Sequence, residues 1–331
     1  MIRYGAAFIL SFVFALYWTP LMRKAALQLG IVDRPDGRLK NQDSAIPYLG
    51  GIAIFIAFLL TVGVFTDFGQ ETLGILLSGS IALMVGLIDD FGVLSPSQKL
   101  LGQTLAALVL VKSGTYIRLT FIPVWIAIPL SVLWILAVTN ALNIIDILDG
   151  LAAGVAAIAT ISIAAANFMA GRNSVAFLCI VLCGAILGFL RHNFHPARIY
   201  LGDAGSLFIG FMLAALSMNA GYTRANLLAV TSPVLILGIP LFDLALVMWI
   251  RWYNGIPMTK GSPDHFALRL RRCKLSVRET AVTTYIVAGL LGGTALLMSQ
   301  VTLEWAVATM AGMFSAAFLS AYLLLKVDMR S

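Results

Sequence analysis

Amide and carboxylate side chains recur at intervals of three near the middle of the chain. Asn140, Asn143, Asp146 and Asp149 follow one another at this spacing within an otherwise apolar segment. On a helix, side chains three positions apart are neighbours on one side. Polar groups inside apolar spans are costly and usually mark functional sites, so four in register are hard to explain as packing alone. The spacing predicts a polar stripe with a chemical task.

Three more acidic residues stand at the ends of apolar runs. Asp89 and Asp90 close one run, and Lys99 follows after a Ser-Pro-Ser turn that could return it to the same place. Asp203 lies between two glycines at an expected helix start, where an anionic group is favoured. Carboxylate and amide oxygens suit a hard divalent cation such as Mg²⁺. Taken singly, a solvated helix end for Asp89 and Asp90 and an ordinary cap for Asp203 remain alternatives.

Two basic segments complete the set of chemically capable residues. Residues 33–51 contain Arg38, and residues 251–278 contain His265 and Arg269. Gly50 and Gly51 open a helix in the first segment, where free backbone N–H groups can meet an anion. The arginines of the second segment suit phosphate recognition, because guanidinium pairs bidentately with phosphate oxygens. A plain basic loop and a basic helix attracted to anionic lipid are the alternatives. His192 and His195, in another polar segment, are interpreted as interfacial loop residues.

Phosphoryl transfer is the chemistry that these residue types fit. No Ser-His-Asp constellation is visible, and the spacing of the three cysteines matches no zinc or disulfide pattern. Carboxylates, a divalent cation and basic groups are the components of phosphoryl transfer, in which the protein positions substrates and offsets developing charge. A donor with a diphosphate and an acceptor in the bilayer would explain an enzyme embedded in lipid.

The composition shows which elements must position these residues. The 331 residues are 60% hydrophobic and 11% charged, with mean hydropathy +0.95. Soluble domains are about 45–50% apolar and about 25% charged, so a soluble enzyme, a disordered chain and a fibrous protein are excluded. Apolar runs are continuous and not alternating, which excludes a membrane β-barrel. We therefore expect an all-α polytopic integral membrane protein with a single transmembrane domain over residues 1–331.

About eleven transmembrane helices are predicted. Positive charges follow the first apolar run, which places the N-terminus outside, and eleven spans then place the C-terminus in the cytoplasm. On this arrangement 17 of the 22 Lys and Arg residues, and 12 of the 15 Asp and Glu residues, fall on the inner side or at inner helix ends. The active site is therefore expected at the cytoplasmic face. The basic loops on the inner side explain the net charge of +7, so this charge does not indicate nucleic-acid binding. The expected spans are residues 4–22, 48–66, 72–88, 99–112, 123–139, 151–170, 174–190, 205–220, 227–250, 280–299 and 305–325.

Taken together, these motifs resemble those of the polyprenyl-phosphate N-acetylhexosamine-1-phosphate transferases, a family that includes the phospho-N-acetylmuramoyl-pentapeptide transferases. The motifs occur in the family's order over about residues 30–270. The matching residues are Asp33 and Pro35; Pro47, Gly50 and Gly51; Asp89, Asp90, Lys99 and Gln103; Asn140, Asn143, Asp146, Asp149, Gly150 and Leu151; Gly202, Asp203, Gly205 and Ser206; and Pro240 and Asp243.

The resemblance implies a reaction in which undecaprenyl phosphate attacks the β-phosphate of a UDP-sugar, giving polyprenyl-diphospho-sugar and UMP. It implies Mg²⁺, with Mn²⁺ as an alternative, and a multi-pass protein of the inner (plasma) membrane that contacts membrane lipid and could form a homodimer. A general base is not obligatory, because a phosphate acceptor is largely ionised near pH 7. By this resemblance, the catalytic residues are Asp89, Asp90, Asp146 and His265; the substrate-binding residues are Lys99, Asn140, Asp149, Arg269 and Arg38; and the metal ligands are Asp203 and Asn143.

Two sublines of this family, and a transporter as a protein of another class, are the competing interpretations. Eleven spans and the Asn-Ala-Leu-Asn motif favour the GlcNAc-1-phosphate subline, which begins cell-surface polysaccharides, over the peptidoglycan pentapeptide subline. The family's His-rich stretch is reduced to His265, and Ile147 stands where the family usually has glycine, so the sugar stays open. A cation-coupled transporter would place its acids near the membrane midplane. Here the acids lie at inner ends, which favours the transferase.

Overall fold

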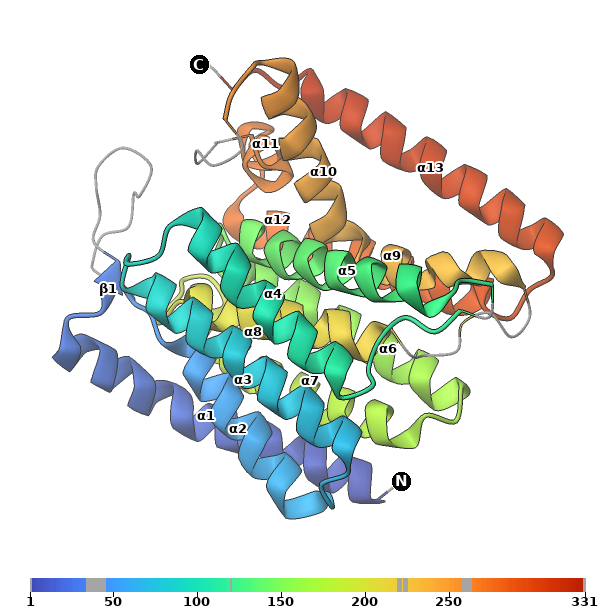
Figure 1. Cartoon of the computed structure of the whole chain (residues 1–331). Coiled ribbons are helices and arrows are strands. Elements are labelled where there is room, and N and C mark those ends of the chain that lie inside the picture. Colours follow the sequence, from blue (N-terminus) through green and yellow to red (C-terminus); the bar gives the residue numbers. More distant parts are fainter. Residues whose placement is uncertain are drawn as a thin grey trace.

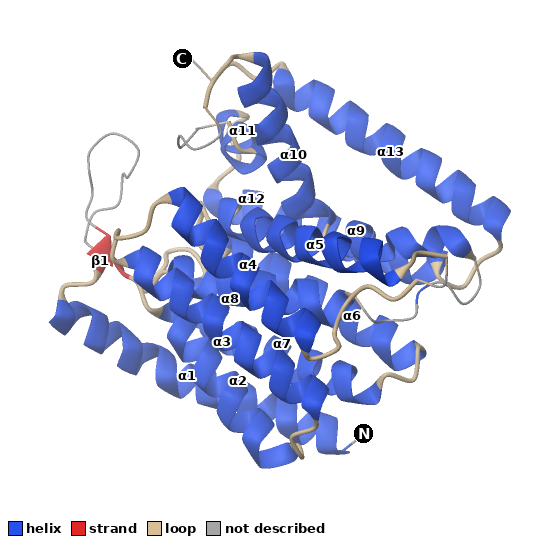
Figure 2. Ribbon diagram, viewed as in Figure 1, coloured by secondary structure: helices blue, strands red, loops and turns tan. Residues whose placement is uncertain are grey.

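The protein is a bundle of long helices, seen in a computed structural model of the chain (Figures 1 and 2). The structure describes residues 2–33, 46–119, 121–218, 222, 226–257 and 264–329. Seven described helices are long and apolar enough to cross a membrane. This supports the prediction of a polytopic helical membrane protein. The seven are α1 (Ile2–Leu29), α3 (Gln70–Asp90), α5 (Val124–Ile144), α6 (Leu151–Met169), α7 (Asn173–Asn193), α12 (Val277–Met298) and α13 (Leu303–Leu325).

Three other helices are shorter than a typical span. They are α2 (Gly50–Phe65), α4 (Pro96–Lys112) and α8 (Gly202–Ser217), with 16, 17 and 16 residues. At 1.5 Å per residue these reach about 24–26 Å, against a hydrocarbon thickness of about 30 Å. Nearly every residue of α8 is buried, so neighbouring helices shield it. The predicted count of eleven spans is therefore not confirmed, and neither are the positions of the termini.

The span expected over residues 227–250 is broken into separate helices. A 3₁₀ turn (Leu227–Thr231) leads into α9 (Ser232–Ile236), and α10 (Gly238–Tyr253) then departs at 78°. Pro240 lies in the first turn of α10, where a helix tolerates a residue that lacks an amide hydrogen. The proline residues thus favour two short helices over one long one.

A small strand pair was also missed by the all-α prediction. β1 (Val32–Asp33) pairs antiparallel with β2 (Ile46–Pro47), with Val32 opposite Pro47. Two residues are too short to show the alternating pattern by which strands are recognised. The pair leads directly into α2, so it sets where that helix begins. The one remaining described helix, α11 (Phe266–Arg272), follows α10.

The outer surface of the bundle is apolar, as a lipid-facing surface requires. Along α13, Phe314 and Phe318 are 70% and 77% exposed, and Figure 1 shows this helix running along the outside. Such a continuous apolar surface is rare on soluble proteins. The interior instead contains buried polar groups such as Gln103 and Asp243. An apolar outer surface around an interior with polar groups fits a protein surrounded by hydrocarbon.

Candidate active site

Four polar side chains from four helices meet at one end of the bundle. Lys99 Nζ lies 2.7 Å from Asp89 Oδ2 and 3.4 Å from Asp203 Oδ2, and it donates to Asn143 Oδ1 at 3.1 Å. Asn143 Nδ2 donates to Asp203 Oδ1 and, at 2.8 Å, to Ser206 Oγ. The four come from the end of α3, the start of α4, the end of α5 and the start of α8. We call Asp89, Lys99, Asn143 and Asp203 the oxygen–lysine cluster.

Helix α4 begins in a way that delivers Lys99 to this cluster. Ser95 and Gln98 form a capping box, and Pro96 occupies the first helical position. This sequence signature fixes a helix start firmly. Lys99 then lies in the first turn, with its side chain mostly enclosed at 16% exposure. The return of Lys99 to the acidic pair, predicted from the intervening turn, is confirmed.

Asn140 and Gln103 join α4 to α5 one turn from the cluster. Asn140 Nδ2 donates to Gln103 Oε1 at 2.7 Å and to Leu136 O at 2.8 Å, and Gln103 Nε2 donates back to Asn140 Oδ1 at 3.3 Å. Both amides are therefore occupied by each other. This arrangement makes Asn140 a bridge between helices and does not favour the predicted contact with substrate.

Asp90 caps the start of α8. Its two carboxylate oxygens accept from Asp203 N at 2.6 Å and from Ala204 N at 3.0 Å. These amides lack partners within their own helix, and a carboxylate is the favoured group at a helix N-terminus. The structure thus gives Asp90 the task of fixing Asp203, the neighbouring cluster residue. The predicted role of Asp90 as a base stays a prediction, with both oxygens already engaged.

Two glycines make this cap possible. Gly202 has φ of +74°, a left-handed conformation that other residues adopt only with strain, and a Cβ there would approach Asp90 Oδ2 to 2.9 Å. A Cβ on Gly86 would meet Asp203 O at 2.3 Å. The absence of side chains at Gly86 and Gly202 therefore allows α3 to touch the backbone of α8.

The turn between α5 and α6 carries the two remaining acids of the stripe. Loss of solvation, together with the smaller effect of the nearby charges of Asp203, Asp90 and Asp149, raises the pKa of Asp146 to about 8. Asp146 is thus an acid that holds its proton near neutral pH when no cation is present. This makes it sensitive to any cation that binds beside it.

Asp149 faces a different partner from the one expected. Its Oδ2 lies 2.7 Å from His195 Nδ1 and accepts from Ala197 N at 3.0 Å. Beside it, Asn193 Oδ1 accepts from Gly150 N at 3.1 Å and Tyr285 OH donates to Gly150 O at 2.7 Å. The interpretation of His195 as a plain interfacial residue is therefore incomplete. The signal that could have identified it was its position in the same polar segment as Asp203.

His265 and Arg269 lie in a separate group around α11. His265 Nδ1 lies 2.8 Å from Asp243 Oδ2, and Asp243, fully buried, also accepts from Phe266 N at 2.7 Å. Arg269, 4% exposed, donates to Asp264 and to the carbonyl oxygens of Leu324 and Val327.

Arg269 thus joins α11 to the end of α13. Its guanidinium nitrogens are all engaged, so its position does not favour the predicted substrate contact. Arg38 lies outside the described residues.

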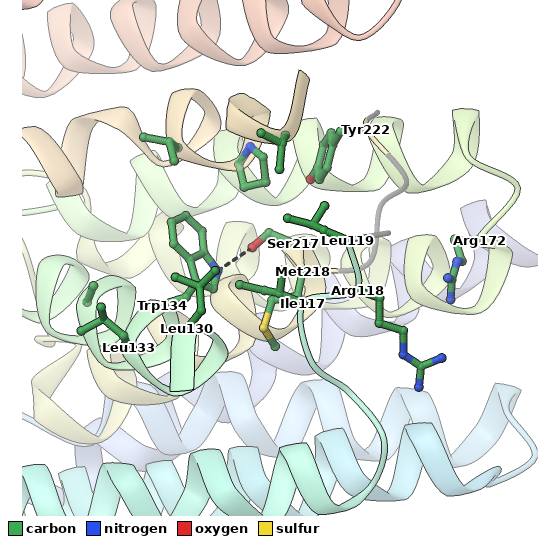
Figure 3. Close-up of a pocket in the computed structure, with 14 residues that line it drawn as sticks. Ile117, Arg118, Leu119, Leu130, Leu133, Trp134, Arg172, Ser217, Met218 and Tyr222 are labelled. Atoms are coloured by element: carbon green, nitrogen blue, oxygen red, sulfur yellow. Dashed lines mark hydrogen bonds between the residues drawn. The ribbon is translucent and has the colours of Figure 1, made fainter. Parts of the chain in front are cut away.

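A cavity elsewhere in the bundle lacks the chemistry of the cluster. It measures about 400 Å³ and lies by the first half of α5 and the end of α8, where Trp134 Nε1 donates to Ser217 Oγ at 3.3 Å (Figure 3). Arg118 and Arg172 also line it, but no carboxylate is among its described lining residues. The oxygen–lysine cluster lies toward the opposite ends of α5 and α8.

The donor set of the cluster fits a hard divalent cation. Asp89, Asn143 and Asp203 each direct an oxygen at one point, which is occupied by the Lys99 ammonium at 2.7–3.4 Å. Mg²⁺ and Mn²⁺ prefer such carboxylate and amide oxygens. Among the described residues no group of three His, Cys, Asp or Glu residues forms a ready metal site. A cation here would therefore use Asn143 and would need Lys99 to move aside.

Comparison with known proteins then identifies the family. The chain is 35% identical to the probable undecaprenyl-phosphate N-acetylglucosaminyl 1-phosphate transferase of Bacillus subtilis (strain 168), over 92% of this chain and 87% of that protein. Residues 72–221 match the family described as Glycosyl transferase family 4. The chain belongs to glycosyl transferase family 4. This confirms the resemblance inferred from the motifs.

Two further relatives have names similar to that of the Bacillus subtilis protein. The decaprenyl-phosphate N-acetylglucosaminephosphotransferase of Mycobacterium tuberculosis (strain ATCC 25618 / H37Rv) is 32% identical over 81% of this chain and 76% of its own length. The undecaprenyl-phosphate alpha-N-acetylglucosaminyl 1-phosphate transferase of Yersinia pestis is 27% identical over 93% and 87%. The family 4 match contains the whole oxygen–lysine cluster, whereas His265 and Arg269 lie beyond it.

Proposed function

We propose that this protein transfers GlcNAc-1-phosphate from UDP-GlcNAc to a polyprenyl phosphate, as a first membrane step of cell-surface polysaccharide synthesis. The observation that carries this proposal is the oxygen–lysine cluster, in which side chains from four helices meet at one point. The protein's relatives are named as polyprenyl-phosphate N-acetylglucosamine phosphotransferases, and these names support the same substrate class for this protein.

The reaction requires little covalent chemistry from the protein. An oxygen of the polyprenyl phosphate forms a new bond to the β-phosphorus of the donor, and the bond from that phosphorus to the bridging oxygen breaks. The bonding electrons leave with UMP. Because the acceptor phosphate is largely ionised at neutral pH, no proton needs to be removed. The main tasks are then positioning and charge compensation, in which Lys99 would bind the donor diphosphate.

Asp203 and Asn143 would hold Mg²⁺, and Asp89 would lie beside it. The ion would supply a positive charge that offsets charge on the transferring phosphoryl group. Asp90 holds the start of α8 and so keeps Asp203 in place. Asp149, kept in position by Ala197 N and His195, would bind the uracil end of the donor. These assignments place diphosphate and nucleotide along one end of the bundle.

This end of the bundle would face the cytoplasm in the inner (plasma) membrane. The excess of Lys and Arg in the segments at this end supports the orientation by the positive-inside rule. The N-terminus would then lie outside and the C-terminus inside. A cytoplasmic site would meet both a soluble nucleotide donor and a phosphate anchored in the inner leaflet.

A donor comparison tests the proposed function. Purified protein in detergent would receive Mg²⁺ and undecaprenyl phosphate with either UDP-GlcNAc or UDP-MurNAc-pentapeptide, and UMP and lipid-linked sugar would be followed. We expect turnover with UDP-GlcNAc alone, abolished by EDTA. Turnover with the pentapeptide donor would assign the protein to the peptidoglycan subline. Folded protein that turned over neither donor would contradict the proposal.

A further inference from the structure

A second, larger cavity lies beside the proposed active site and belongs to no step of the proposed reaction. It measures about 650 Å³ and is formed by α1, the last turns of α7, the segment after α7 and the start of α12. None of the oxygen–lysine cluster lines it. Its walls divide into a basic part and an apolar part, and helix α7 contributes to both.

The basic part holds three arginines. Arg191 is in the last turn of α7, Arg198 is in the following segment and Arg278 is at the start of α12. Within the described residues, none of these three forms an ion pair with a carboxylate. Three cations gathered around one cavity repel one another unless an anion joins them. No carboxylate is among the described residues that line the cavity, so no residue of the lining balances the charge of these exposed arginines.

The apolar part extends along the last turns of α7. Leu187, Leu190 and Arg191 fall on one helix face, and Phe12 of α1 closes the wall beside them. From Leu187 to Arg191 the helix rises about 6 Å. The cavity thus presents guanidinium groups at its polar end and hydrocarbon one turn deeper. That order matches a phospholipid, in which a charged phosphate precedes glycerol and acyl carbons.

We infer that this cavity binds the phosphate of an anionic phospholipid from the surrounding leaflet. The three arginines would bind its phosphate oxygens, and Phe12 and Leu187 would contact the first acyl carbons. A free phosphate would not use the apolar wall, so the lipid is the favoured source of the anion. This goes beyond the proposed transfer reaction, because neither the UDP-sugar nor the polyprenyl phosphate is the ligand.

The cavity is connected to the proposed nucleotide site through one side chain. His195 lines the cavity, its carbonyl oxygen accepts from Arg278 Nε at 3.0 Å, and its ring nitrogen lies 2.7 Å from Asp149. A lipid phosphate that orders Arg278 would therefore hold His195 and, through it, Asp149. Bound lipid would thus help to keep the nucleotide-binding residue in place.

Native mass spectrometry of the delipidated full-length protein tests the inference without requiring activity. Dioleoyl-phosphatidylglycerol, dioleoyl-phosphatidylcholine and glycerol 3-phosphate would be titrated separately. We expect one phosphatidylglycerol to bind at least about tenfold more tightly than phosphatidylcholine. The double variant Arg191→Gln with Arg198→Gln should lose about tenfold of that affinity, since hydrogen bonds to charged groups are among the stronger ones.

Lys24→Gln is the control for charge loss: Lys24 is exposed near the C-terminal end of α1 and lies outside the cavity, and the variant loses one positive charge, as Arg191→Gln alone does. Its affinity should stay within about twofold of wild type. If the double variant does not fold, Arg191→Gln alone should still weaken binding about threefold.

Four results would overturn the inference: equal binding of both lipids, equal binding of glycerol 3-phosphate, displacement of the lipid by UDP-GlcNAc, or unchanged binding in the variants.

Discussion

At the scale of single residues, the site is organised around one lysine among oxygens. Lys99 compensates Asp89 and Asp203 where a divalent cation would otherwise do so. The identity of these residues could be predicted from sequence, because acids at the ends of apolar runs are conspicuous. The separate contacts that each of these residues makes could not be predicted. Asp89 and Asp90 are adjacent in sequence, yet one contacts Lys99 and the other caps α8.

Asp90 is predicted to support activity by capping the start of α8, and not by acting as a base. The Asp90→Asn variant should lose melting temperature and turnover together, because an amide cannot accept from both backbone donors as a carboxylate does. The turnover that remains should keep the wild-type pH profile. Melting temperature and a pH–rate profile of the purified variant would check this. A variant with unchanged melting temperature and a lost acidic limb in its profile would instead identify Asp90 as a base.

Asp146 makes stability depend on pH. Its pKa is about 8 in the folded protein and 3.8 in the reference state, so the folded form binds the proton more tightly. The free energy of unfolding should therefore fall as pH rises from about 4 to about 8. Asp146→Asn should make this slope shallower and be more stable than wild type at pH 8. Melting curves in EDTA from pH 5 to 9 would test this, and parallel curves for the two proteins would contradict it.

At the scale of elements, the site depends on how closely α3 approaches α8. A Cβ on Gly86 would meet the backbone of Asp203 at 2.3 Å, so Gly86→Ala should separate the helices and misplace Asp203. We expect turnover to fall at least tenfold, even though alanine favours helices by about 1 kcal/mol. Gly63→Ala is the control, since Gly63 in α2 has open space around it. Equal activity of the two variants would contradict the close-approach argument.

The elements themselves were predicted unevenly from sequence. Long apolar runs identified helices such as α6 and α7 well, because a continuous apolar stretch leaves few alternatives. The break at Leu237 was missed, since its prolines lie within an apolar stretch that passes a hydropathy test as one span. The contacts of Asn140 with Gln103, and of Asp149 with His195, were also missed. Both join residues 37 or more positions apart, which a single sequence does not reveal.

At the scale of the whole molecule, the orientation can be tested with the protein's own cysteines. Cys273 is exposed, whereas Cys179 and Cys183 are buried. Since Cys273 lies in the basic segment that we place in the cytoplasm, a membrane-impermeant maleimide should label it only in inverted vesicles. Cys273→Ser should remove the signal.

Lys112→Cys in the Cys273→Ser background should be labelled from the opposite side, because Lys112 ends α4 at the other end of the bundle. Labelling of Cys273 in intact cells would reverse the proposed orientation.

The most direct test of the central claim is the Mg²⁺-dependent turnover of the Asp203→Asn variant. The oxygen–lysine cluster is proposed to hold the metal through Asp203, and the variant keeps the size and the backbone contacts of that residue. We expect UMP release from UDP-GlcNAc with undecaprenyl phosphate to fall at least about a hundredfold, with a melting temperature close to wild type. Ser315→Ala, an exposed change on α13, should leave turnover unchanged. Turnover by Asp203→Asn within about twofold of wild type, with the same Mg²⁺ requirement, would contradict the assignment of the active site.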